Sequence, residues 1–210
     1  MQDIIDGMMY NLNKRARDVP SLSGIESVIN KTQSHTIAEF REEPMSDAHQ
    51  SQQPVLEPGT IIPAFTLPGA DGMPHSPWTY KQREHLVLLF TRNPTSSETR
   101  GLLKAFAHEY KAFREEMCAI LAITPATVLA NLRLQDELSL PFPLLADPQG
   151  DVIAKYTRWN ANNKDLLPAI VLADRYNAVY QQWIAEQEAD LPSIEEILEA
   201  LRYMNKLCTP

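Results

Sequence analysis

Cysteine is scarce in this sequence, because only Cys118 and Cys208 occur among its 210 residues. The two cysteines form no Cys-x-x-Cys pair and no spacing typical of a metal site. The five histidines are scattered along the chain and do not indicate a zinc site either. We therefore expect no bound metal and no cofactor.

Long apolar runs and an excess of positive charge are also missing. No apolar stretch approaches the roughly 20 residues that cross a bilayer, and the longest candidate, Met117–Ala130, is interrupted by Pro125. The acidic N-terminus does not read as a secretory signal. The net charge is -8, whereas nucleic-acid binding needs a clustered basic surface. The short basic cluster Asn13–Arg17 is interpreted as a solvated helix end. We expect a cytoplasmic protein that neither binds nucleic acid nor inserts into a membrane.

Three segments differ in composition. Residues 1–43 are predicted to form a helical arm, because their apolar side chains recur at largely helical spacing. Residues 44–58 are polar and rich in proline, which indicates a linker. Residues 59–210 are predicted to form the main domain. An amphipathic helix must bury its apolar stripe, so the arm packs either on this domain or on a partner, which is another protein or a second copy of the chain.

The main domain alternates strand and helix patterns. The continuous apolar run His85–Thr91 predicts a strand buried on both faces. Ser193 and Glu196 predict a capping box at the start of the last helix. This order predicts an α/β fold with a mixed sheet flanked by helices. Further helices are expected at 101–116, 126–139, 151–159 and 193–207, and further strands at 117–124, 169–174 and 179–185.

Several stretches of the main domain resemble one known family. The segment Pro58–Ser76 has a Pro-x-Phe-x-Leu-Pro run followed by Asp-Gly, and similar stretches lie at Leu140–Tyr156, Leu167–Trp183 and Ala189–Leu201. In this order they resemble the peroxiredoxin branch (alkyl hydroperoxide reductase, or AhpC, and thiol-specific antioxidant, or TSA) of the thioredoxin-like fold. The resemblance covers about 150 residues. It implies a redoxin domain, and it implies that Pro168 lies beside the active site, where the family often has a cis proline. The residues of the opening stretch that carry the resemblance are Gly59, Pro63, Phe65, Leu67, Pro68, Asp71 and Gly72.

The sequence departs from this family at the turn that follows the apolar strand. Active members usually carry a loop such as Thr-Pro-x-Cys or Cys-Pro-x-Cys there, leading into a helix. Aligned without gaps, Ser96 stands at the first threonine or cysteine of that loop, and Thr99 stands at the cysteine that attacks peroxide. A shift by one residue puts Glu98 there instead, and no register supplies a cysteine. The degenerate loop comprises Pro94, Thr95, Ser96, Ser97, Glu98 and Thr99.

The missing thiol has a chemical consequence. Peroxide reduction needs a thiolate, which a helix N-terminus stabilises, and a sulfur atom that cycles through sulfenic acid. A serine or threonine hydroxyl cannot complete this cycle. The first hypothesis is therefore a pseudoenzyme without catalytic residues that works through protein–protein interaction, using its fold surface and its arm.

Two alternatives stay open. In the first alternative the chain is a thiol peroxidase or oxidoreductase that uses Cys118 or Cys208 in an atypical way. Cys118 is interpreted as a buried strand residue and Cys208 as an incidental terminal thiol, and both interpretations count against it. In the second alternative the start of the helix at Ser96–Thr99 binds a small anion, with the acidic Glu98 counting against it. The pair Asp147 and Asp151 is interpreted as a turn rather than as a metal loop.

Overall fold

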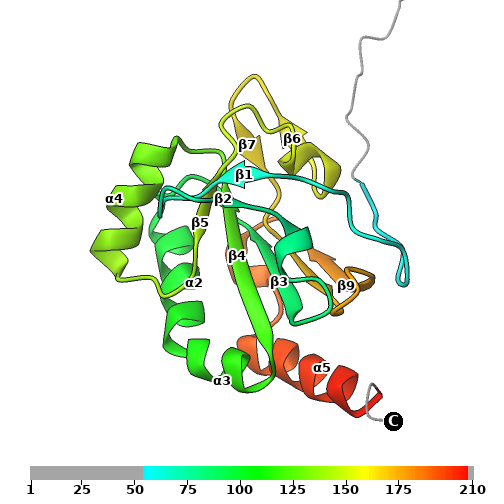
Figure 1. The fold of residues 1–210 in the computed structure, drawn as a ribbon. Helices are drawn as coiled ribbons and strands as arrows, with labels where there is room; N and C mark the ends of the chain where they lie inside the picture. The colour runs from blue at the N-terminus through cyan, green and yellow to red at the C-terminus, as the bar shows by residue number, and fades with distance from the viewer. Residues whose placement is uncertain (1–53, 208–210) are drawn as a thin grey trace, which may run out of the picture. The chain divides into compact units, whose positions relative to one another are not determined.

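The computed structural model describes residues 54–207 (Figure 1). The predicted arm at 1–43, the basic cluster at 13–17, most of the linker and Cys208 lie outside the described residues. The proposed segment boundaries therefore stay a prediction.

A five-stranded mixed sheet forms the centre of the described domain, in the order β5-β4-β3-β8-β9. Strand β3 runs parallel to β4 and antiparallel to β8, so it lies in the middle of the sheet. All six residues of β3 and all seven of β4 are buried, as their continuous apolar runs predicted. The strand bounds are β3 His85–Phe90, β4 Cys118–Thr124, β5 Leu144–Ala146, β8 Ala169–Ala173 and β9 Val179–Ile184.

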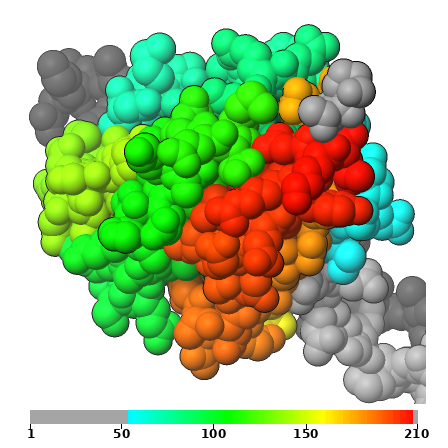
Figure 2. Space-filling model, turned by 90° about the horizontal axis from the view of Figure 1, so that it is seen from below, coloured from blue at the N-terminus to red at the C-terminus, as the bar shows by residue number. Residues whose placement is uncertain are grey.

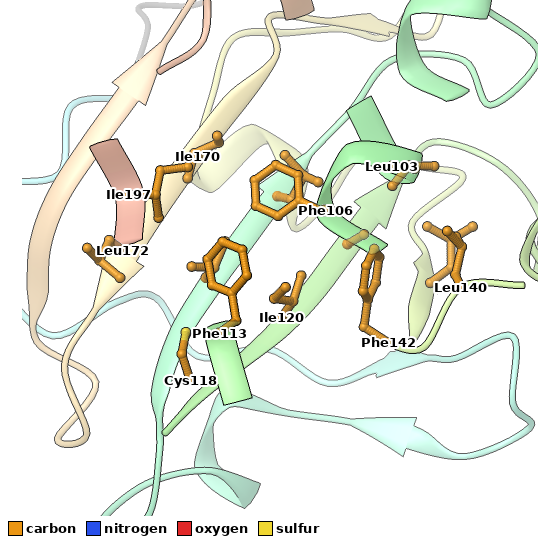
Figure 3. Close-up of a cluster of buried hydrophobic side chains, with 14 of the residues drawn as sticks. Leu103, Phe106, Phe113, Cys118, Ile120, Leu140, Phe142, Ile170, Leu172 and Ile197 are labelled. Carbon is orange, nitrogen blue, oxygen red and sulfur yellow. The ribbon is translucent and has the colours of Figure 1, made fainter. Parts of the chain in front are cut away.

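Four helices contribute to the core on one face of this sheet. They are α2 Ser97–His108, α3 Tyr110–Glu115, α4 Val128–Leu138 and α5 Ile194–Leu207. Their apolar side chains pack on alternate residues of the strands, among them Val87 and Leu89 of β3. Figure 3 shows Ile120 of β4 and Ile170 of β8 in the same cluster. Figure 2 shows α5 beside the α2–α3 stretch on the surface of this layer.

The other face of the sheet is covered by the N-terminal stretch of the domain and by a short 3-10 helix, η2 Ile153–Lys155. Phe65, Phe90 and Tyr156 meet there, with the rings of Phe90 and Tyr156 stacked at 4.8 Å. Two small hairpins lie outside the main sheet: β1 Leu67–Pro68 with β2 Pro74–His75, and β6 Trp159–Asn160 with β7 Asp165–Leu166.

Most of the predicted helices and strands are confirmed, but the helix expected at 151–159 is wrong. The chain forms only the single 3-10 turn η2 there, and it is extended again at β6. The capping box at α5 is confirmed, because Ser193 N–H donates to Glu196 Oε2 at 2.7 Å and Glu196 N–H donates to Ser193 Oγ at 3.3 Å.

Candidate functional site

The β3–α2 turn starts its helix with well-formed caps. Asn93 Oδ1 accepts from the backbone N–H and from the hydroxyl of Thr95, both at 3.0 Å. Ser96 is the N-cap of α2, and its Oγ accepts from Glu98 N–H at 3.2 Å. The turn hydroxyls therefore satisfy backbone donors that the first turn of a helix leaves free.

The six residues singled out in the sequence differ in exposure. Thr95, Ser97 and Glu98 are exposed, and Ser96 is half-buried. Pro94 and Thr99 are buried, and the exposed fraction of Thr99 is 0%. Thr99 is the third residue of α2, so it points from the first helical turn into the protein.

Thr99 is hydrogen-bonded to a residue that sequence reasoning missed, the buried Glu188. The Thr99 hydroxyl donates to Glu188 Oε1 at 2.9 Å. The backbone N–H of Arg92, at the start of the turn, donates to the same oxygen at 3.2 Å. Glu188 has an exposed fraction of 5% and lies on the 3-10 helix η3 Glu188–Asp190, ahead of α5. It thus ties η3 to both ends of the turn.

The side chain of Arg92 is directed to other acceptors. Its guanidinium donates to the backbone oxygens of Leu166 at 3.0 Å and Glu186 at 2.7 Å. It also lies 3.4 Å from a carboxylate oxygen of Asp165. Arg92 therefore fastens the β6–β7 hairpin and the segment before η3 to the turn, while Glu188 receives only its backbone N–H.

Pro168 lies beside this turn, at the end of the sheet where β3 finishes and β8 begins. It directly precedes Ala169, which pairs with Phe90 at the end of β3. The proximity implied by the family resemblance is therefore supported by the register. The implied cis bond is wrong, because every peptide bond in the described range 54–207 is trans.

Cys118 lies at the opposite end of the strands from this turn. It pairs with His85 at the start of β3, whereas the turn follows Phe90. The two ends of β3 are five residue steps apart, or about 16 Å at roughly 3.3 Å per step. Cys118 is fully buried beside Phe113 (Figure 3), and burial raises the pKa of its thiol well above the ordinary value. The structure thus keeps this thiol apart from the turn and protonated.

The residues weighed for metal binding form a turn. Asp147 Oδ2 accepts from the backbone N–H groups of Val152 at 2.9 Å and Ile153 at 2.8 Å. Asp151 is exposed. In the range 54–207, no group of three or more His, Cys, Asp or Glu residues is arranged to hold a metal ion. The helices of this range include none that is long and apolar enough to cross a membrane.

Comparison with known proteins shows the family of the chain. Residues 58–182, more than half of the sequence, match the model of the AhpC/TSA family. The chain therefore belongs to that family, and the redoxin domain expected from the sequence is confirmed.

Two curated relatives and several solved structures are similar to the chain. "Putative peroxiredoxin MT2597" and "Putative peroxiredoxin Rv2521" of Mycobacterium tuberculosis are 32% identical over 106 residues, a match that covers 50% of this chain and 65% of each relative. The chain thus spans just under two thirds of their length.

The solved structures show the fold. The Mycobacterium tuberculosis peroxidoxin BcpB has a TM-score of 0.63 at 19% identity, covering 71% of this chain and 99% of its own. The yeast mitochondrial 1-Cys peroxiredoxin has a TM-score of 0.64 at 15% identity, covering 72% of this chain and 79% of its own. The described domain has the thioredoxin-like fold of these proteins.

Proposed function

We propose that this chain is a peroxiredoxin-like protein that has lost peroxidase chemistry and acts by binding. The observation that carries the proposal is the side chain at the first turn of α2. Aligned without gaps to the family's loop, Thr99 takes the place of the peroxide-attacking cysteine, and its hydroxyl is buried and bound to Glu188. A hydroxyl in this position has no sulfur to oxidise and reduce.

The exposed surface supports a binding role. Three apolar side chains at the start of α4 are exposed, namely Val128, Leu129 and Leu132. The amphipathic pattern predicted for residues 1–43 supplies a further candidate surface. The partner is either another protein or a second copy of the chain, and a cytoplasmic location is part of the proposal.

A thiol peroxidase that uses Cys118 or Cys208 is the second candidate, because the curated relatives carry the name peroxiredoxin. The position of Cys118 counts against it. A buried thiol with a raised pKa supplies little thiolate, and the side chain of Cys118 has an exposed fraction of 0%.

Peroxide consumption with a thiol reductant tests both candidates. The full chain, a Cys118→Ser variant and a Cys208→Ser variant are compared with a buffer control. We expect all three proteins to match the buffer rate. Turnover by the full chain that disappears in one of the two variants would refute the proposal and identify the thiol that acts.

A further inference from the structure

Glu188 places a buried carboxyl group against Thr99, the position aligned with the family's peroxide-attacking cysteine. Its Oε1 accepts two hydrogen bonds, from Thr99 Oγ1 and from Arg92 N–H. Its Oε2 is buried and has no hydrogen-bond partner. Among the described residues no lysine, arginine or histidine forms an ion pair with Glu188.

A second buried polar group, the Thr91 hydroxyl, lies on the face of the sheet that is covered by α2. Val87 and Leu89 belong to the core on that face, so Thr91, two residues further along the strand direction, faces the same way. The Thr91 hydroxyl is also buried without a partner. In its ionised form, a buried carboxylate that has no cationic partner disfavours the ionised form of a titratable neighbour, because the two charges have the same sign.

We propose that Glu188 prevents redox chemistry at this site. Its carboxylate requires a hydrogen-bond donor at residue 99, which Thr99 supplies, and it would hold even a cysteine at that position in the protonated form. This inference rests on the proposed function and deepens it, since both residue 99 and its partner Glu188 then oppose thiol chemistry at the site. A threonine-to-cysteine change alone would therefore not recover a reactive thiol.

The test introduces a thiol at position 99 in a Cys208→Ser background, where the remaining Cys118 is buried. Thr99→Cys is compared with Thr99→Cys combined with Glu188→Gln. The rate of alkylation by iodoacetamide is followed from pH 5 to pH 10. We expect Glu188→Gln to lower the pH midpoint of the introduced thiol by about one unit and to raise its rate at pH 7 about tenfold.

Two control variants change exposed residues of the same two helices, η3 and α2. Asp190→Asn removes an exposed carboxylate from the same 3-10 helix and keeps the hydrogen bond between Thr99 and Glu188, and we expect it to leave the pH midpoint unchanged. Ser97→Cys places a thiol on the exposed side of the same helical turn, where Glu188→Gln is expected to have little effect. Equal pH profiles for Thr99→Cys with and without Glu188→Gln would overturn the proposal.

A second measurement decides the question in the native site if the cysteine variants do not fold. Thr99→Val and Glu188→Gln, alone and together, form a double-mutant cycle read by urea unfolding. We expect the coupling to change the unfolding equilibrium constant about tenfold. Additive effects would overturn the role of Glu188. Peroxide turnover by the native chain would instead refute the proposed function, so the two failures are distinguishable.

Discussion

Among single residues, His85 shows how burial controls a titratable group in this domain. Its side chain is fully buried in β3, and its Nε2 lies 3.0 Å from Asn205 Oδ1 of α5. Burial lowers the pKa of His85 below the ordinary histidine value, and the positive charge of Arg175 acts in the same direction. The hydrogen bond to Asn205 and the charges of Asp174 and Glu116 oppose this shift without cancelling it.

His85 is expected to make the stability of the domain depend on pH. The unfolded chain protonates this histidine near pH 6.5, whereas the folded chain does so only at lower pH. The unfolded state therefore binds more protons as the pH falls below about 6.5, and the free energy of unfolding decreases there by up to about 1.4 kcal/mol per pH unit. Urea unfolding between pH 5 and pH 8 measures this slope.

The matched comparison for this prediction uses two histidine substitutions. His85→Gln removes the titrating group and should flatten the slope below pH 6.5, although it also lowers the overall stability. His108→Gln changes a histidine whose side chain is 83% exposed and should keep the native slope. An unchanged slope in His85→Gln would show that other groups cause the pH dependence.

At the scale of secondary-structure elements, apolar patterns predicted the buried strands and the long helices. The runs at β3, β4 and β8 have strand length and are fully buried, so pattern and structure agree. The expected helix at 151–159 failed because tertiary contacts override its pattern. Gln182 Nε2 donates to Tyr156 O at 2.7 Å, and the Thr157 hydroxyl donates to Leu167 O at 2.8 Å.

The candidate site could be predicted only in part. The turn and its capping hydroxyls follow from local sequence, because an N-cap acts within a few residues. Glu188 lies 89 residues from Thr99, and no motif connects the two positions. Glu188 reaches Thr99 only because the segment after β9 folds back beside the start of α2. No local sequence pattern predicts the path of that segment.

Gly150 allows the turn before η2 to pack closely against Trp159 of the β6–β7 hairpin, and substitution of this glycine tests that packing. The residue has a φ of 76°, and a Cβ atom there would lie 2.1 Å from Cε2 of Trp159. Gly150→Ala therefore adds backbone strain and a steric clash. We expect it to lower the free energy of unfolding by about 3 kcal/mol, measured by urea or thermal unfolding.

Gly101 is the matched control for this substitution. It lies inside α2, and a Cβ atom there would meet nothing within 4 Å. Gly101→Ala should raise the free energy of unfolding by roughly 0.5–1 kcal/mol, because alanine favours the helix. A Gly150→Ala protein as stable as the Gly101→Ala protein would contradict the packing of Trp159 on this turn.

At the scale of the whole molecule, the described domain has the components of an independent fold. Within the described range 54–207, buried side chains of residues 62–204 form a core on each face of its sheet. Deletion of residues 1–50 is therefore expected to leave cooperative unfolding intact. If unfolding stays cooperative in the truncated protein, the amphipathic pattern predicted for residues 1–43 is left for a partner.

Association through the predicted arm can be distinguished from association through the exposed α4 surface. Native mass measurement and co-purification are compared for the full chain, for the chain lacking residues 1–50, and for Leu129→Asp, which adds a charge at an exposed apolar position of α4. We expect truncation to remove the association and Leu129→Asp to keep it. The reverse result would assign binding to the α4 surface. Association unchanged in both variants would contradict a binding role for either surface, since a charge placed in an apolar contact costs more than a surface substitution elsewhere.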